Sequence, residues 1–175
     1  MTEADLKQYF DKLATQSVDI KHDPAAKKKS FFYIDNPFDL QAIENALRNT
    51  IQVPALLLDV PEIKPDSNGS TNYTVSMDCT FSIVTKAKGT DAIEAARTQC
   101  YQIGMKFLST MHADSRKGTM IPGKRAYFRI NEDQCNVGLS PIGPMAIDFY
   151  GWLFSFRIVC PFSITVNSGD WQDLS

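Results

Sequence analysis

The sequence predicts an α+β fold: a largely antiparallel β-sheet with a long amphipathic helix packed across one face and additional N-terminal helices. One observation is the segment NYTVSMDCTFSI, residues 72–83, where apolar and small polar residues alternate strictly, as in a strand with one buried face. A second is the segment 91–111, where apolar residues recur every three or four positions over about five helical turns. Clusters of turn residues separate these segments from several shorter apolar runs.

Length and composition are those of a single domain. The 175 residues are 43% hydrophobic and 22% charged, which is ordinary for a globular protein and sufficient for a substantial core. We predict one domain over residues 1–175, with an N-terminal helix and exposed loop at 1–30, a core at 31–167 and a polar tail at 168–175. The net charge of −2 disfavours generic nucleic-acid binding. No apolar run is long enough to span a bilayer and no secretion signal is visible, so we expect no membrane contact.

The N-terminal part predicts two helices and a short strand. Residues 2–15 place apolar side chains at helical spacing behind Thr2, which can cap the helix. In the following loop, HDPAAKKKS, the run of three lysines is interpreted as a solvated flank or, alternatively, as a contact for phosphate or an acidic partner. FFYID predicts a strand, and the next helix is expected to begin with Asn36 as its cap and Pro37 in its first turn.

The middle of the chain predicts a hairpin and the long helix. Residues 53–60 are nearly continuously apolar, as in a strand covered on both faces, and we expect them to pair with residues 73–83 across a turn in KPDSNGS. Asp91 and Glu94 predict a capping box at the start of the helix. Gly104, beside the apolar stripe, is either a point of close approach to a neighbouring element or a tolerated glycine.

The C-terminal part predicts further strands. RAYFRI and CNVGL are short strand segments, and a break in SPIGPM separates them from a long alternating segment that begins near residue 146 and runs to residue 167. Pro161 lies in this segment and cannot donate a ladder hydrogen bond, so it predicts an edge position or a bulge.

The residues that usually carry chemistry are sparse. The four cysteines are scattered: Cys79, Cys100, Cys135 and Cys160. We expect buried free thiols and folding in a reducing cytoplasm. His22 lies in a polar loop, and His112 lies at a helix end, where an imidazole suits the helix dipole. Because the sequence contains no nucleophile elbow, phosphate-binding loop or metal-ligand cluster, we predict a protein that is not an enzyme and that holds no cofactor and no metal.

The polar phase of the two long strands is the unusual feature. It carries Thr74, Ser76, Asp78 and Thr80 on the first strand and Arg157 on the last, with almost none of the lysine and glutamate that keep a monomeric sheet from associating. We interpret these residues as an interface with another protein or with a helix of the same chain. The alternative is an ordinary solvent-exposed face. If their strands are neighbours, Asp78 and Arg157 can pair.

The order of the elements points to a known family. An apolar strand (VPALLLDV) precedes a strongly alternating strand (NYTVSMDCTFSIVTKA), an amphipathic helix (TDAIEAARTQCYQIGMKFLSTM) and an aromatic alternating strand (GWLFSFRIVCPFSITV). This order resembles that of tail-terminator and tail-completion (neck) proteins of long-tailed bacteriophages. The resemblance covers roughly residues 51–167, whereas residues 31–50 and the long C-terminal strand region depart from the family pattern.

The resemblance implies a non-enzymatic virion protein, made in the host cytoplasm. Such a protein forms a homo-oligomeric, usually hexameric ring on the tail tube protein, stops tube growth and joins the tail to head-completion (neck) proteins. DNA can pass through such a ring without being specifically bound. The polar phase would then meet the neighbouring subunit, and the basic loop 115–125, with Arg116, Lys117 and Lys124, and the tip 65–70 would contact the tube or neck. Two other interpretations stay open: a different neck, connector or tube subunit, and a domain that holds a small apolar ligand between the sheet and the long helix.

Overall fold

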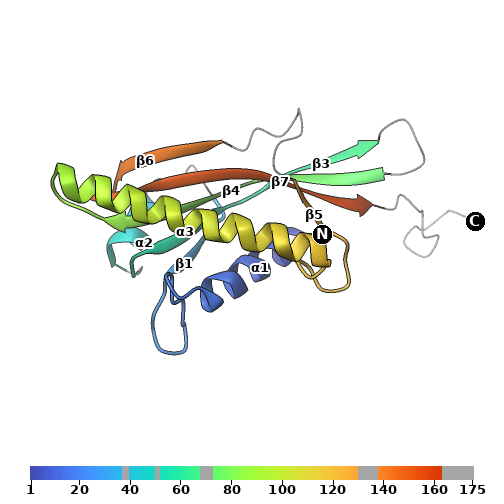
Figure 1. The fold of residues 1–175 in the computed structure, drawn as a ribbon, viewed down its shortest axis with the longest axis horizontal. Coiled ribbons are helices and arrows are strands. Elements are labelled where there is room, and N and C mark those ends of the chain that lie inside the picture. The colour runs from blue at the N-terminus through green and yellow to red at the C-terminus, as the bar shows by residue number, and fades with distance from the viewer. Residues whose placement is uncertain (37–39, 50–51, 68–72, 130–137, 163–175) are drawn as a thin grey trace, which may run out of the picture.

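The structure, a computed structural model, describes residues 1–36, 40–49, 52–67, 73–129 and 138–162. Within them a seven-stranded, mostly antiparallel sheet carries a long helix and the N-terminal helix on one face (Figure 1). The elements follow one another as α1 (Glu3–Gln16), β1 (Phe31–Ile34), α2 (Leu40–Asn49), β2 (Ala55–Asp59), β3 (Glu62–Ser67), β4 (Tyr73–Lys86), α3 (Thr90–Lys117), β5 (Tyr127–Arg129), β6 (Leu139–Met145) and β7 (Phe149–Phe162).

Strands β4 and β7 form the centre of the sheet. Each has 14 residues, and they pair antiparallel over their whole length, from Tyr73 opposite Phe162 to Lys86 opposite Phe149. Along the outer side of β4, β2 pairs with one half and β3 with the other. Along the outer side of β7, β6 and β5 divide the strand in the same way. β1 lies beyond β2 and runs parallel to it.

The main core lies between this sheet and the two helices α1 and α3. The apolar phase of β4, including Met77 and Phe81, faces the helices, as does the matching phase of β7. Phe81 stacks on Phe154 with ring centroids 4.8 Å apart. Gly104 lets α3 approach this pair closely, because a Cβ at that position would lie 2.0 Å from the Phe154 ring. The sequence left two readings of Gly104 open, and the structure supports close approach.

A second, smaller core lies on the opposite face of the sheet. There α2 contributes Ile43 and Leu47, which pack with Leu57, Val84 and Phe149. β2 is therefore covered on both faces, as its continuous apolar sequence predicts, because its alternate residues belong to the two cores. This second core covers only one end of the sheet.

Several predictions from the sequence are confirmed. The fold class, the helix at residues 2–15 and the antiparallel pairing of residues 53–60 with the long alternating strand all agree with the structure. Thr2 caps α1 through a capping box with Asp5. Cys79, Cys100 and Cys160 are buried free thiols, and burial raises the pKa of Cys100 to about 12, so that this thiol stays protonated at neutral pH.

Other predictions about the backbone were wrong. The start of KPDSNGS is not a turn, since residues 64–67 belong to β3, and the SPIGPM break is β6, an edge strand that has no neighbour on its outer side in the described part of the chain and so tolerates prolines. α3 has no capping box: its N-cap is Gly89, at a φ of 86° that glycine adopts readily. It also continues to Lys117, where Gly118 ends it in the left-handed region.

His22 lies in a loop, as predicted, but its side chain is buried, which was not anticipated. A few expectations fall outside the described residues. These are Pro37 in the first turn of α2, residues 68–70 of the predicted turn, Cys135, and the tail at 168–175.

Candidate interaction surface

The predicted interface residues of β4 lie together at one end of the sheet, which we name the ribbon end and define as residues 62–67, 73–80 and 155–162. Three strands pair there: β3, β4 and β7. Thr74, Ser76, Asp78 and Thr80 share one face and are partly exposed. Neither α1 nor α3 covers this face, because both helices pack against the opposite phase of β4.

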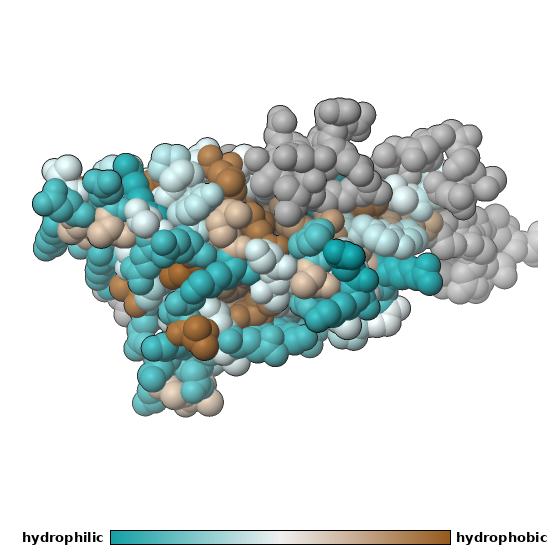
Figure 2. Space-filling model, viewed as in Figure 1, coloured by the Kyte–Doolittle hydropathy of each residue, from teal (hydrophilic) through white to brown (hydrophobic). Residues whose placement is uncertain are grey.

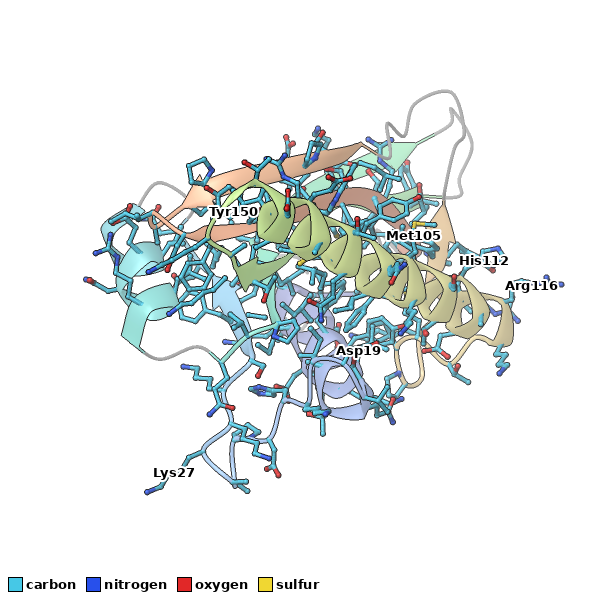
Figure 3. All side chains as sticks on the ribbon, turned by 60° about the vertical axis from the view of Figure 1, so that its left-hand side comes forward. Asp19, Lys27, Met105, His112, Arg116 and Tyr150 are labelled. Atoms are coloured by element: carbon cyan, nitrogen blue, oxygen red, sulfur yellow. The ribbon has the colours of Figure 1, made fainter. Side chains whose placement is uncertain are left out.

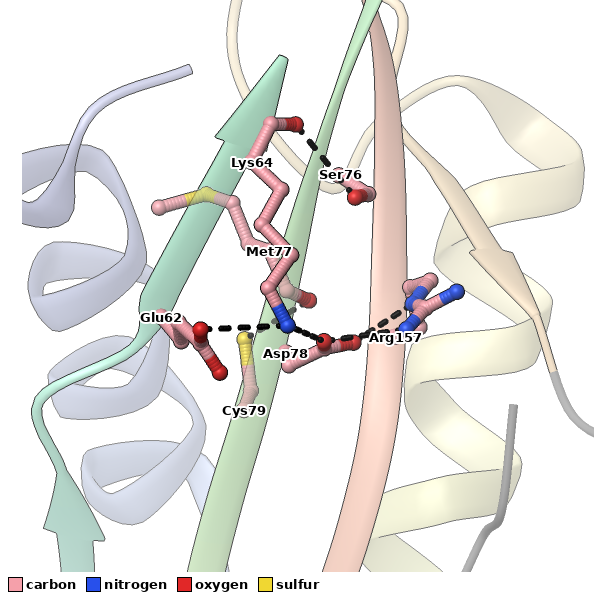
Figure 4. A network of polar contacts seen from close by, with 7 residues as sticks. All are labelled: Glu62, Lys64, Ser76, Met77, Asp78, Cys79 and Arg157. Atoms are coloured by element: carbon pink, nitrogen blue, oxygen red, sulfur yellow. Dashed lines mark hydrogen bonds and ion pairs between the residues drawn. The ribbon is translucent and has the colours of Figure 1, made fainter. Parts of the chain in front are cut away.

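A row of alternating charges crosses the polar face of the ribbon end (Figure 4). Glu62 and Asp78 are directly opposite each other in the β3–β4 register, a like-charge pairing that is unfavourable alone. Lys64 relieves it, since its Nζ lies 3.1 Å from Glu62 Oε1 and 3.4 Å from Asp78 Oδ2. On the other side Arg157, opposite Asp78 in the β4–β7 register, donates to both of its carboxylate oxygens, with Nη2 2.9 Å from Oδ2.

The charges in this row hold one another ionised. Hydrogen bonding from Arg157 keeps the pKa of Asp78 below its ordinary value, although partial burial acts in the opposite direction. A hydrogen bond to Glu62 raises the pKa of Lys64. The side chains of Asp78 and Arg157 are 31% and 22% exposed, so this bidentate pair is partly withdrawn from water. Two acids and two bases therefore leave the row without net charge.

Hydroxyl groups extend the polar face along β4. The Thr80 and Ser155 hydroxyls lie 3.4 Å apart on opposite strands, and either can donate to the other. Ser76 donates to the backbone carbonyl of Lys64 at 3.4 Å. The polar face of β4 is not exposed along its whole length, however. Ser82 is only 7% exposed, because the second core begins at this end of β4 with Val84.

The basic residues predicted as contacts lie elsewhere. Arg116 and Lys117 are exposed in the last turn of α3, where a positive charge suits the helix dipole. Lys124 is engaged by α1, since its Nζ lies 2.6 Å from Asp5 Oδ2. Burial acts to raise the pKa of Asp5, but hydrogen bonds from Lys124 and Thr2 outweigh it and lower this pKa to about 2.

The expectation of a flexible basic loop at 115–125 was therefore wrong. Its first residues are helical, Met120 and Ile121 are buried, and the Ser115 hydroxyl accepts a hydrogen bond of 2.8 Å from the Phe128 N–H. The structure does not bring this segment to the polar face of the ribbon end, because α3 and its C-terminal turn lie on the helical side of the sheet.

Sequence reasoning missed an apolar patch on the other face of the ribbon end. Ile63, Tyr73 and Phe162 are 46%, 36% and 46% exposed. All three lie on the phase that forms the main core further along the strands, since Ile63 is opposite Met77 and Tyr73 is opposite Phe162. The patch is uncovered because the strands extend past the ends of α1 and α3 (Figure 1). Alternation in the sequence shows that these residues share a face, but not where the helices stop covering it.

A hollow between α3 and the β6–β7 edge was also not anticipated as a specific site. It has a volume of about 890 Å³, and apolar atoms reach the surface around it (Figure 2). Tyr101 and Trp152 line it, with ring centroids 5.1 Å apart in an edge-to-face arrangement, together with Leu139. The guanidinium of Arg97 is 5.8 Å from the centre of the Tyr150 ring.

The described residues contain no group of three or more histidine, cysteine, aspartate or glutamate side chains placed to hold a metal ion. Among these same residues, no helix combines the length and apolar character needed to cross a membrane. No model of a known protein family matches the chain, and no curated protein does.

Proposed function

We propose that this chain is a structural virion protein of a long-tailed bacteriophage, which forms a ring at the head-proximal end of the tail tube. The ring would stop tube growth and join the tail to the head or neck. Two things support the proposal: the resemblance in element order, and the two-sided ribbon end. One face of the ribbon end carries the charge-compensated row, and the other carries the uncovered apolar patch.

Both faces of the ribbon end suit contact with another protein surface. Each charge in the row already has an opposite neighbour, so a second copy approaches a row of charges that are already compensated. On the other face, covering Ile63, Tyr73 and Phe162 contributes about 25 cal/mol per Å² of apolar area removed from water. Exposed apolar patches rimmed by polar residues are typical of interaction sites.

The position of the ribbon end fits a ring. It lies at one end of an elongated molecule, with β6 and the start of α3 at the other (Figure 1). When such a surface meets a different surface of the next copy, the contact is heterologous, and these contacts close into a ring if the rotation between copies is a whole fraction of a turn. Arg116 and Lys117, exposed on the helical side, are then available for the tube or the neck.

The test measures the mass of the full-length chain by light scattering over a range of concentrations, with and without purified tail tubes. We expect a ring, or a concentration-dependent oligomer, in the unmodified chain. Asp78→Lys should weaken it, because a third cation beside Lys64 and Arg157 replaces the carboxylate that holds the row together. Thr80→Lys should do the same by placing a charge on the hydroxyl surface.

Thr110→Lys is the matched control, because it makes the same change on an exposed face of α3 away from the ribbon end. Circular dichroism should show that all three variants keep the native fold. A chain that stays monomeric even beside tail tubes would overturn the proposed ring. Normal assembly of both ribbon-end variants would overturn the interface while leaving the ring possible through another surface.

Electron microscopy separates the terminator from the other virion parts. Binding confined to tube ends supports a terminator, whereas tubes made by the chain itself support a tube subunit. Rings that bind neither position on the tube support a connector in the neck.

A second candidate function rests on the hollow beside α3. Its apolar lining suits the body of a small ligand, and the Arg97 side chain, which also lines it, adds a positive charge. Saturable binding of the dye 8-anilinonaphthalene-1-sulfonate by a monomeric chain, abolished by Trp152→Ala, would favour this function. Absence of binding would remove it.

A further inference from the structure

A second open surface lies at the outer edge of β1, far from the charge row in the order of the strands. A pocket of about 810 Å³ lies there between β1, α1 and the loop that precedes β1. Within the described residues β1 pairs with β2 alone, so its other edge carries no strand. Phe31 and Tyr33 line the pocket. An edge of this kind can accept a strand from another chain.

The backbone of β1 directs hydrogen-bonding groups toward the pocket. The carbonyls of Ser30 and Ile34 accept bonds of 2.8 and 3.0 Å from the chain of β2 and the residue that follows it. In a parallel ladder, alternate residues direct their N–H and C=O groups to opposite edges. Phe31 and Tyr33 therefore direct theirs to the open edge.

His22 fixes the start of this edge. Its side chain is 4% exposed, and its Nδ1 accepts hydrogen bonds from the Ser30 N–H at 3.0 Å and the Phe31 N–H at 3.1 Å. The ring proton is therefore on Nε2, which lies 3.3 Å from Asp11 Oδ1. The carbonyl of Phe31 and both backbone groups of Tyr33 are left for an added strand, on an edge already held in the required geometry.

The lining of the pocket is positively charged. It contains Lys7, Lys27 and Lys29 against a single acid, Asp11, whose carboxylate faces His22. These lysines form no ion pair with a carboxylate in the part of the chain that the structure describes. Lys7 and Lys29 instead lie over aromatic rings of β1, at 5.0 and 5.6 Å from the ring centres. Lys27 projects from the loop away from the body of the protein (Figure 3).

We propose that an extended acidic segment of a partner protein binds along the open edge of β1 as an added strand. The carbonyl of Phe31 and both backbone groups of Tyr33 supply the strand pairing. Lys29, over the Phe32 ring, and Lys7, over the Tyr33 ring, place one cation on each face of the strand, where they attract carboxylates of the added segment. A compact anion would use the lysines but not the edge. The residues that line the site lie between Ala4 and Tyr33, and the site does not depend on the proposed ring.

The probe is a fluorescein-labelled peptide of eight residues, alternating glutamate and valine, tested against the full-length chain by fluorescence anisotropy. We expect saturable binding that weakens at least tenfold when Lys27→Glu and Lys29→Glu are combined. Two further peptides separate the contributions. The same peptide with lysine in place of glutamate should not bind, and one with a central proline should bind at least tenfold more weakly, because it lacks a ladder donor. Nuclear magnetic resonance should show the Tyr33 amide shifting on binding.

The matched control combines Lys12→Glu with Lys88→Glu, which changes the net charge equally at two exposed lysines outside the pocket. It should bind the probe as the unmodified chain does. Equal weakening by both double variants would show general charge attraction and overturn the site. Failure of the unmodified chain to bind at millimolar peptide would also overturn it. Displacement of the probe by an unlabelled peptide of residues 163–175 would assign the edge to this protein itself and overturn the assignment to a partner.

Discussion

One alternating sequence produces both faces of β4, but the two faces have different surroundings. Met77 and Phe81, on one face, are fully buried under α1 and α3. Asp78 and Thr80, on the other face at the same level of the strand, stay partly exposed and bond across to β3 and β7. Alternation alone decides that two faces exist. The position of the helices decides which stretch of each face becomes a core.

At the ends of β4 the exposure of the two faces is exchanged. On the helical face the apolar phase continues to Tyr73, beyond the helices, and becomes an exposed patch. On the polar face the phase ends at Ser82 and Val84, where the second core covers it. The candidate interaction surface is therefore the part of each face that no element of the described chain covers.

The largest expected effect comes from emptying the helical face. Phe107 is buried on α3, with its ring 6.0 Å from that of Phe81. We expect Phe107→Ala to lower the free energy of unfolding by about 3–5 kcal/mol, through lost burial and the cavity left behind. Urea denaturation measures this. Thr80→Ala on the polar face is the comparison and should cost less than about 1 kcal/mol. Equal losses of unfolding free energy in the two variants would mean that the helical face is no better packed than the polar face.

A smaller effect is expected from overfilling the same face. Gly104→Ala places a methyl group against the ring of Phe154, which is fully buried and stacked on Phe81. Overpacking of this kind costs about 1–3 kcal/mol, and the better helix propensity of alanine returns up to about 1 kcal/mol. We expect a net loss of about 1–2 kcal/mol by urea denaturation. Gly118→Ala, in a left-handed cap with open space around it, tests strain without overpacking. A stabilised Gly104→Ala chain would show that the helix can move away from the sheet.

Local sequence rules predicted the fold where one element determines its own structure. The N-cap at Thr2, the stripe of α3 and the alternation of β4 each depend on neighbouring residues, and each agrees with the structure. The capping box predicted for α3 was a local failure, whereas the strands that were missed lie where a distant segment decides. Residues 64–67 and 140–145 contain turn-forming residues but become strands because β4 and β7 offer long edges to pair with.

The candidate site was predictable in composition but not in position. The sequence named Asp78 and Arg157 as possible partners, but only the register of β4 with β7 makes them direct neighbours. The part that Glu62 and Lys64 play in the charge row was not anticipated, because Glu62 lies just before a predicted turn and Lys64 lies in it. The burial of His22 was not anticipated because its partners, the backbone N–H groups of Ser30 and Phe31, carry no signal in the sequence.

The charge row should contribute modestly to stability. The Asp78–Arg157 pair is bidentate but partly exposed, so we expect a coupling energy of about 1 kcal/mol. A double-mutant cycle with Asp78→Ala, Arg157→Ala and their combination measures it. Because the pKa of Asp78 is lowered in the folded state, this contribution is present above the unfolded pKa and is lost as the pH falls through the folded value. A coupling energy indistinguishable from zero would leave the row with a role in assembly alone.

The smallest predicted effect concerns the acid on the helical side. Burial acts to raise the pKa of Asp5, but the interactions with Lys124 and Thr2 outweigh it and lower this pKa from 3.8 to about 2. Its stabilisation is therefore complete above pH 5, declines as the pH falls through 3.8, and is gone below about pH 2. Solvent screening of this partly exposed pair limits it to about 0.5 kcal/mol. Unfolding free energies of the unmodified chain and Asp5→Asn should differ by that amount at pH 6 and converge at pH 2, and urea denaturation at each pH gives both values. A constant difference between the two chains at all pH values would mean that Asp5 acts through packing and not through its charge.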